Sequence, residues 1–195
     1  MYDRKSVKLM KRIFDLLAAL GLMLILAPLF LLVVLAVRLT SVGPVLFRTQ
    51  RVGKGNKLFT MYKFRTMRMD TPQVATHLLK EPDQFLAPIG KILRRTSLDE
   101  LPQLINVLSG DMTLVGPRPA LFNQDDLVAL RTARGVDALT PGITGWAQVN
   151  GRDELPIPEK VKLDEWYLKN RSFWLDLKIL GMTVFKVIRK EGVVH

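Results

Sequence analysis

The sequence predicts a small mixed α/β domain on an N-terminal re-entrant membrane helix, with further amphipathic helices at the membrane interface. Two observations favour this fold class: an uncharged apolar run at residues 16–37, and the short helix-like and strand-like segments that follow it. A chain of 195 residues supports one domain of ordinary size and leaves little room for a second. We therefore expect residues 1–40 to form the membrane segment with its basic flanks, and residues 41–195 to form one cytoplasmic domain.

The apolar run is long enough to enter a bilayer. All of its 22 residues are apolar apart from Gly21 and Pro28. A helix of this length rises about 33 Å, roughly the thickness of the hydrocarbon core. A cleaved signal peptide is the alternative, but its apolar region usually has about 7–15 residues. No small-residue cleavage pattern follows the run, so membrane insertion is the better explanation.

Flanking charge and Pro28 favour a helix that enters and leaves the membrane on the same side. Basic residues flank the run at both ends. The positive-inside rule places both flanks in the cytoplasm, which a single span does not allow. Pro28 lies inside the run, where it removes one helical hydrogen bond. We predict a helix–break–helix with the break at Ala27 and Pro28. A tilted span with a tolerated proline kink remains the alternative.

The distribution of charge along the chain indicates which class of partner the protein binds. The chain holds 29 Lys and Arg against 18 Asp and Glu, a net charge of +11 that indicates an anionic partner. Residues 1–68 contain 13 basic and 2 acidic side chains, whereas residues 69–195 contain 16 of each. A nucleic-acid binder anchored in the membrane is the alternative, but it needs a basic face on the folded domain. Since the excess surrounds the apolar run, membrane lipids are the expected partner and nucleic acid is not.

The absence of cysteine excludes several classes of chemistry. With no Cys in the chain, disulfides, Cys-ligated zinc, iron–sulfur clusters and thiol nucleophiles are ruled out. His77 and His195 are the only histidines, and we expect both at the surface.

The remaining elements follow from periodicity and turn residues. Residues 45–67 predict two strands around a turn at residues 53–56, which lacks the Lys-Ser/Thr ending of a phosphate loop. Residues 140–151 have strand character and end in Asn150-Gly151, a strong turn pair. The other expected elements are a polar loop with one short helix at 69–88, helices at 89–95, 101–108 and 121–134, a rigid turn at 110–119, and a long helix at about 159–190.

That last helix has two interpretations. It carries Trp166 and Trp174 with basic residues nearby, a combination that suits a bilayer interface. Its apolar residues also recur at three- and four-residue steps, which is equally typical of a helix packed on the domain core. The sequence does not decide between these two interpretations.

The chemical centre of the chain is the acidic pair Asp99 and Glu100, which follows Arg94 and Arg95. Helix capping explains such a pair: Ser97 and Glu100 have the spacing of a capping box. Alternatively Asp99 is the cap, with Pro102 in the first turn of the helix. In either register, helix amides and arginines favour the ionised form of both carboxylates. An ionised carboxylate is also able to attack phosphorus or to hold Mg²⁺.

A second motif is Gly116-Pro117-Arg118-Pro119. Two prolines restrict the backbone on either side of Arg118, which lowers the entropy lost when its guanidinium binds a phosphate. A rigid turn with a surface arginine is the alternative.

These residues carry a resemblance to a known family. The chain resembles the bacterial sugar transferases, the monotopic phosphoglycosyl transferases that begin glycan assembly on a polyprenyl phosphate, and in particular the small members made of the catalytic core alone. Six motifs match in order: residues 11–15 before the apolar run, then 62–67, 97–104, 110–119, 141–151 and 176–180.

The resemblance implies an enzyme that transfers a phosphosugar from a UDP-sugar to undecaprenyl phosphate and releases UMP. It implies a covalent phosphosugar on Asp99 and an Mg²⁺ cofactor at Glu100, beside Asp99. Arg94 and Arg118 occupy motif positions associated with the substrate phosphates, and Lys63 lies in a further matching motif. A scaffold that keeps the fold without activity is the alternative, and the intact acidic pair argues against it.

The resemblance also implies a setting. It places the protein on the cytoplasmic face of the bacterial inner membrane, at the first membrane step in assembling an O-antigen, capsule, exopolysaccharide or protein-linked glycan. It favours the re-entrant form of the helix, although Ala27 stands where small relatives can carry Ser before the proline. The identity of the sugar and the formation of a homo-oligomer stay open.

Overall fold

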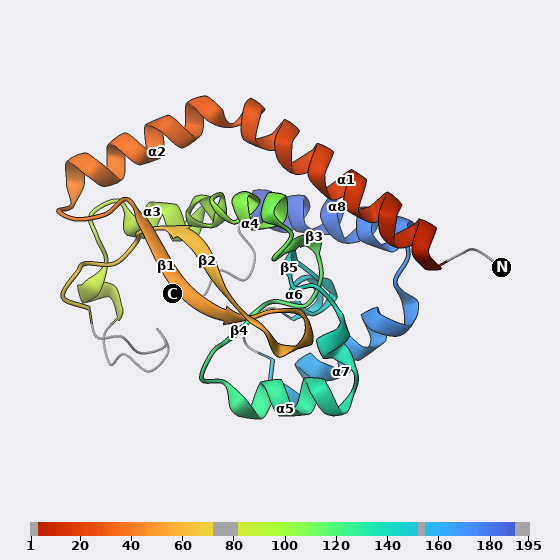
Figure 1. Cartoon of the computed structure of the whole chain (residues 1–195). Coiled ribbons are helices and arrows are strands. Elements are labelled where there is room, and N and C mark those ends of the chain that lie inside the picture. Colours follow the sequence, from red (N-terminus) through yellow and green to blue (C-terminus); the bar gives the residue numbers. More distant parts are fainter. Residues whose placement is uncertain (1–3, 72–81, 152–154, 190–195) are drawn as a thin grey trace.

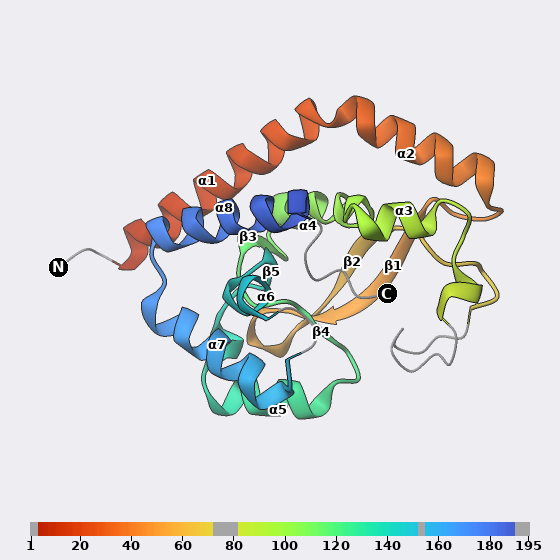
Figure 2. The same cartoon turned by 180° about the vertical axis from the view of Figure 1, so that it is seen from behind.

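The computed structural model of the whole chain describes residues 4–71, 82–151 and 155–189. A bent pair of helices, α1 and α2, arches over one side of the molecule, and α5 and α7 lie at the opposite side (Figures 1 and 2). Helices α3, α4 and α8 lie beneath the arch, with the strands between them and α5. The predicted mixed α/β domain is confirmed.

The described elements have the following bounds. The helices are α1 (Arg4–Ile25), α2 (Ala27–Thr40), α3 (Gly90–Arg95), α4 (Gln103–Ser109), α5 (Asp125–Ala133), α6 (Trp146–Asn150), α7 (Ile157–Asn170) and α8 (Phe173–Arg189). The 3₁₀ turns are η1 (Lys54–Asn56), η3 (Pro82–Phe85), η4 (Leu98–Glu100) and η5 (Val136–Ala138). The strands are β1 (Leu46–Val52), β2 (Leu58–Phe64), β3 (Thr113–Val115), β4 (Ala120–Leu121) and β5 (Gly142–Thr144).

The break predicted at Ala27 and Pro28 is present. Helices α1 and α2 meet at Leu26 with a bend of 63° between them, and Pro28 lies in the first turn of α2. Proline has no N–H to donate and its ring clashes with the preceding turn, so the bend has an identified cause. Within the described residues, no single helix is both long and apolar enough to cross a membrane. The bent pair Lys8–Ile25 and Ala27–Thr40 has that length and composition only when taken together.

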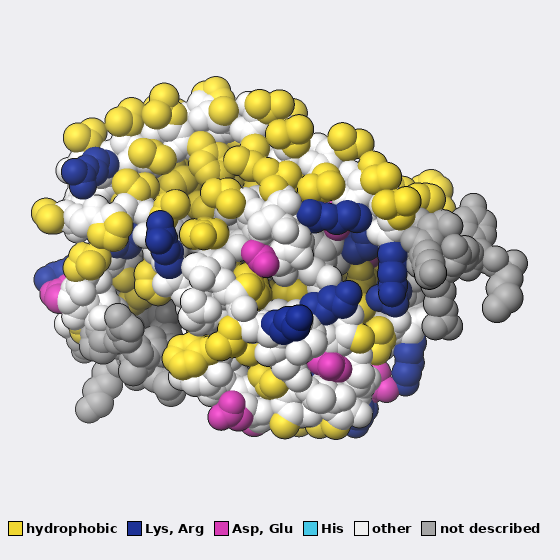
Figure 3. Space-filling view, viewed as in Figure 1, with side chains coloured by type: hydrophobic (Ala, Val, Ile, Leu, Met, Phe, Trp, Pro, Cys, Tyr) yellow, Lys and Arg dark blue, Asp and Glu magenta, His cyan; other side chains and the backbone are white. Residues whose placement is uncertain are grey.

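The two faces of the bent pair differ. Its outer face is lined by exposed apolar side chains, which cover the top of the molecule in Figure 3. Its inner face packs on the domain: Ala19 of α1 is fully buried in the main core, and Val33 and Val37 of α2 pack with Phe64 and Leu93. The bent pair is therefore joined to the core of the domain along both of its arms.

Polar side chains at the base of α1 strengthen this attachment. Arg12 donates to the main-chain oxygen of Val107 over 2.6 Å. Asp15 is only 3% exposed, and its carboxylate accepts a hydrogen bond of 2.5 Å from the Thr113 hydroxyl. Because these are buried bonds between α1 and the elements α4 and β3, they fix where α1 begins relative to the domain.

Two small sheets lie below the helices. Strands β1 and β2 form the predicted hairpin around η1, with Leu46 opposite Phe64, and β4 pairs with the outer edge of β1. Strands β3 and β5 pair in parallel. A side chain at Gly142 would meet the main-chain nitrogen of Gly116 at 2.1 Å, so this pairing requires glycine. The segment 110–119, expected to be only a rigid turn, therefore contains a strand.

The predicted long helix at 159–190 is wrong as a single element. It is two helices, α7 and α8, separated at Arg171 and Ser172. The Ser172 hydroxyl accepts a hydrogen bond of 3.2 Å from the Leu175 amide, which caps the start of α8. Periodicity alone did not detect the break, because apolar residues recur at helical spacing on both sides of it.

Three smaller expectations also differ. Asn150 and Gly151 close the short helix α6 and do not join two strands. The helix expected at 121–134 begins at Asp125, because Ala120 and Leu121 pair with β1 as β4. His77, His195 and the middle of the 69–88 loop lie outside the described residues. In the described part of that loop, η3 is the short helix.

Both interpretations of the last helix find support in different residues. In α8, Ile179 is fully buried in the main core, whereas Trp174 is 79% exposed. In α7, Trp166 stacks on Trp146 with ring centroids 4.6 Å apart. Helix α8 thus has one face in the core and a second apolar face on the surface.

Candidate active site

The acidic pair lies on a short, tightly turned connection between α3 and α4. Ser97 precedes it in the left-handed conformation (φ 55°), which is uncommon for a residue with a side chain. Asp99 and Glu100 follow Ser97 on the 3₁₀ turn η4. This geometry directs the pair toward strand β2 instead of along a helix axis.

Both capping interpretations are wrong. Ser97 makes no side-chain capping bond at η4, and Asp99 lies inside that turn and does not precede it. Helix α4 begins at Gln103, with Pro102 in the capping position. Glu100 turns away from the helix start because two cationic side chains from other elements bind it more strongly than a single amide would.

Glu100 is the point at which three segments meet. The Lys63 ammonium on β2 donates to Glu100 Oε1 over 2.6 Å, and the Arg118 guanidinium donates to the same oxygen over 3.1 Å. Arg118 comes from the segment between β3 and β4. Burial alone would raise the pKa of Glu100, but Lys63 and Arg118 outweigh it and hold that pKa well below its usual range. Glu100 is therefore ionised throughout the physiological range.

The pKa of Asp99 shifts in the opposite direction, upward. Asp99 is 8% exposed, and Lys63 Nζ lies 3.8 Å from its Oδ2, beyond hydrogen-bond distance. Burial raises the pKa of Asp99, since the attraction of Lys63 only partly offsets it and the charge on Glu100 adds to it. Two neighbouring carboxylates whose pKa values move apart are typical of groups with different roles in one site.

Arg94 contributes from the last turn of α3. Its Nε donates to the Thr66 hydroxyl over 3.0 Å, which holds the side chain beside the acidic pair. Its positive charge is one of those that act to lower the pKa of Asp99.

The structure therefore brings four of the predicted residues together and sets Arg94 beside them. We call Lys63, Asp99, Glu100 and Arg118 the catalytic cluster. Ala27 and Pro28 are separate from it, at the bend where α1 meets α2. Arg118 lies in a rigid turn with its side chain 35% exposed, and that side chain is ion-paired with Glu100.

The backbone around Arg118 is held by hydrogen bonds from neighbouring segments. The Gly116 amide donates to Thr144 of β5 over 2.8 Å, and the Gly142 amide donates to the Pro117 oxygen over 2.9 Å. The predicted rigidity of this segment, residues 116–119, is thus confirmed, although it comes from β5 as well as from the two prolines.

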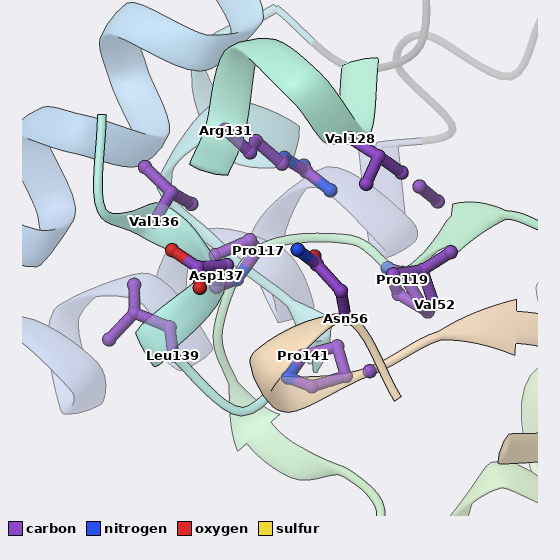
Figure 4. A pocket seen from close by; sticks show the side chains of 12 residues that line it. Val52, Asn56, Pro117, Pro119, Val128, Arg131, Val136, Asp137, Leu139 and Pro141 are labelled. Carbon is purple, nitrogen blue, oxygen red and sulfur yellow. The ribbon is translucent and has the colours of Figure 1, made fainter. Parts of the chain in front are cut away.

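One pair of polar residues beside this segment was not found from the sequence. Arg131 of α5 and Asp164 of α7 form a buried ion pair, and Arg131 extends into a small pocket that Pro117 and Pro119 also line (Figure 4). The two residues are 33 positions apart on separate helices, and no motif connects them.

The donor set was compared with what Mg²⁺ requires. Among the residues that the structure describes, no group of three or more His, Cys, Asp or Glu side chains is placed to hold a metal ion. Mg²⁺ is usually bound through one or two carboxylates together with substrate phosphates and water. The adjacent oxygens of Asp99 and Glu100 fit an ion shared with a phosphate group, and they do not fit an ion held by protein alone.

Comparison with known proteins identifies the family of the chain. The family model described as bacterial sugar transferase matches residues 6–190. The sugar transferase EpsL of Bacillus subtilis, itself described as uncharacterized, is 47% identical over 186 residues, which is 95% of this chain and 90% of EpsL. A UDP-glucose:undecaprenyl-phosphate glucose-1-phosphate transferase of Caulobacter vibrioides is 44% identical over 199 residues, 97% of this chain and 73% of the relative.

Other relatives are considerably longer. The undecaprenyl-phosphate galactose phosphotransferase of Salmonella typhimurium is 37% identical over 209 residues, which is 97% of this chain but only 42% of the relative. Because the family model spans nearly the whole chain, and EpsL is matched along most of its own length, the chain belongs to the bacterial sugar transferase family.

Proposed function

We propose that this protein transfers a phosphosugar from a UDP-sugar to undecaprenyl phosphate, releasing UMP. The observation that carries the proposal is the catalytic cluster, in which Lys63 and Arg118 contact Glu100 at 2.6 and 3.1 Å, whereas Asp99 is paired with Lys63 only at the longer distance of 3.8 Å. The names of the Caulobacter and Salmonella relatives support the same general reaction.

The proposed reaction has two displacements. An Asp99 oxygen attacks the sugar-bearing phosphorus of the UDP-sugar, an O–P bond to Asp99 forms, and the bond to UMP breaks. An oxygen of undecaprenyl phosphate then attacks the same phosphorus and displaces the Asp99 carboxylate, which yields a diphosphate-linked lipid sugar. Dividing the transfer in this way lets one small site serve a soluble and a lipid substrate in turn.

The remaining cluster residues act through charge. Arg118 and Lys63 are placed to stabilise negative charge on the transferring phosphate, and Arg94 adds a third cation nearby. Asp99 and Glu100 would hold the Mg²⁺ cofactor, which when bound neutralises phosphate charge. Proton transfer by a histidine is not required in this scheme.

We also propose that α1 and α2 dip into the cytoplasmic leaflet of the bacterial inner membrane and return. The 63° bend, the exposed apolar outer face and the basic flanks support this topology. The exposed face of α8, which includes Trp174 and Phe185, would then lie at the membrane interface. In this setting the protein would catalyse the first membrane step of an O-antigen, capsule, exopolysaccharide or glycoprotein glycan pathway.

The reaction is tested by measuring UMP release from the purified full chain with undecaprenyl phosphate and Mg²⁺. The panel is UDP-glucose, UDP-galactose and UDP-N-acetylgalactosamine, the sugars named for relatives. We expect one sugar to support release and ping-pong kinetics. Absence of UMP release with every UDP-sugar would contradict the proposal.

The topology is tested by labelling. Since the chain has no cysteine, single cysteines at positions 1 and 41 give unambiguous sites on either side of the bent pair. Both should react only with reagent supplied from the cytoplasmic side. Reaction from opposite sides would support a broken span instead.

A further inference from the structure

Arg131 connects α7 to the backbone of the catalytic cluster. Its Nε and Nη2 donate to Asp164 Oδ2 over 3.0 and 2.6 Å. Its remaining nitrogen, Nη1, donates over 2.8 Å to the main-chain oxygen of Arg118. The same arginine therefore holds a carboxylate on one helix and the peptide group of a cluster residue.

Burial makes this contact stronger than a surface contact of the same length. Arg131 is 8% exposed and Asp164 is 2% exposed. A guanidinium fixed by two hydrogen bonds to one carboxylate has little freedom to move its third donor. The position of the Arg118 oxygen is thus set by the pair Arg131–Asp164, with Pro117 and Pro119 limiting the backbone on either side.

Helix α7 also holds the other end of the same segment. Tyr167 lies one turn after Asp164 and is 3% exposed. Its hydroxyl donates to Asp176 Oδ1 over 2.6 Å and lies 3.3 Å from the Val115 oxygen. Two successive turns of α7 thus contact the chain three residues apart, at Val115 and, through Arg131, at Arg118.

We propose that Arg131, held in place by Asp164, is a positioning residue that keeps the Arg118 guanidinium on Glu100. Its effect on turnover rests on the proposed function, whereas its effect on geometry does not. A purely structural tie between α5 and α7 is the competing explanation, and it predicts no specific connection to Arg118.

The same two helices provide a matched control. Arg134, directly after α5, pairs with Glu165 of α7 over 2.5 Å, and this pair is more exposed than Arg131–Asp164. A variant at Arg134 therefore removes an arginine–carboxylate pair between the same elements and leaves the Arg118 backbone contact intact.

The main test variant is the double substitution Arg131→Met with Asp164→Leu. Replacing a buried ion pair by apolar residues of similar volume often leaves stability unchanged or higher, so α5 and α7 should still pack. We expect kcat/KM for UMP release to fall about 10- to 100-fold, the range for a catalytic group displaced by about 1 Å. Arg134→Met should keep the unmodified value, and thermal unfolding should confirm that both proteins are folded at the assay temperature.

Arg131→Lys is a second variant in case the double substitution does not fold. A lysine has one terminal nitrogen and does not bind Asp164 and the Arg118 oxygen in the same fork-like geometry. A folded variant of either kind with unreduced kcat/KM would overturn the proposal.

A double-mutant cycle separates positioning from general damage. If Arg131 acts through Arg118, the Arg131 substitution should cause no further loss in a chain that already carries Arg118→Gln. A further loss equal to that in the unmodified background would overturn the proposal.

A structure of the folded Arg131 variant gives a result that does not require the reaction. We expect the Arg118–Glu100 contact to be lost while Lys63 remains on Glu100. If the 3.1 Å contact persists, the proposal is wrong. If instead the unmodified protein releases no UMP, the proposed function fails while this structural test still stands.

Discussion

Two clusters of opposite charges meet at Arg118, and they differ in how the charge of each aspartate is compensated. The catalytic cluster binds the Arg118 side chain, and the Arg131–Asp164 pair binds its main-chain oxygen. In the pair, Nε and Nη2 of Arg131 both donate to one oxygen of Asp164. In the cluster, Glu100 accepts hydrogen bonds from Lys63 and Arg118, while Lys63 lies 3.8 Å from Asp99, beyond hydrogen-bond distance.

The difference shows that burial beside an arginine does not by itself make a carboxylate catalytic. Burial raises the pKa of Asp99 and also that of Asp164. Asp164 has its negative charge compensated directly by Arg131, which suits a structural role. Asp99 is less completely compensated because its neighbour Glu100 competes for the same cations, which leaves its oxygens available to a substrate.

The largest effect is expected at Asp99. Asp99→Asn should reduce UMP release to background and abolish any covalent phosphosugar adduct, because an amide does not displace UMP. Turnover and intact-protein mass spectrometry measure both. Asp111→Asn, an exposed aspartate near the end of α4, is the control. UMP release by Asp99→Asn at the unmodified rate would exclude Asp99 as the nucleophile.

A smaller but still large loss is expected at Arg118. Arg118→Gln should lower kcat by about 10²- to 10³-fold, the usual effect of removing one donor that stabilises transition-state charge. The loss should exceed that of the Arg131 variants, which displace the guanidinium without removing it. If the Arg131 variants are slower than Arg118→Gln, Arg131 has a role independent of Arg118.

Glu100→Gln should alter the metal dependence. The amide keeps the size of the side chain but loses the charge that both cations and Mg²⁺ require. We expect the Mg²⁺ titration of UMP release to shift to higher concentration. An unchanged titration would remove Glu100 from the ligand set.

The smallest effect concerns stability and pH. The folded-state pKa of Asp99 is raised, so at neutral pH the native state contains a charged group that burial disfavours. Asp99→Asn should therefore unfold at a higher temperature than the unmodified protein at pH 7. The difference should shrink as pH falls through the raised pKa, because Asp99 then becomes neutral in the native state. A lower melting temperature for Asp99→Asn than for the unmodified protein at pH 7 would contradict this prediction.

The raised pKa of Asp99 also predicts how the reaction rate depends on pH. Attack requires the ionised Asp99 carboxylate, so kcat should fall as pH decreases through the pKa of Asp99, while Glu100 remains charged because its pKa is lowered. A rate that rises toward acidic pH would contradict nucleophilic attack by Asp99.

Local signals predicted the parts of the fold that depend on few residues. The hairpin formed around its turn, the helix broke next to Pro28, and the segment around Arg118 was rigid, because each depends on turn or proline chemistry close in sequence. The division of 159–190 and the direction of Glu100 were mispredicted. In both cases the local residue spacing was compatible with two structures, and contacts with residues distant in sequence determined which of the two formed.

The sequence by itself determined the break in the N-terminal helix, and it predicted entry into a membrane and a chemical centre at Asp99, Glu100 and Arg118. These properties follow from composition, proline and ordered motifs. Only the tertiary structure decided that Glu100 binds both Lys63 and Arg118, and that the pKa values of Asp99 and Glu100 shift in opposite directions. It also decided that Arg131, paired with Asp164, binds the main-chain oxygen of Arg118. The physical reason is that desolvation and ion pairing depend on distances between residues far apart in the chain, which local sequence patterns do not encode.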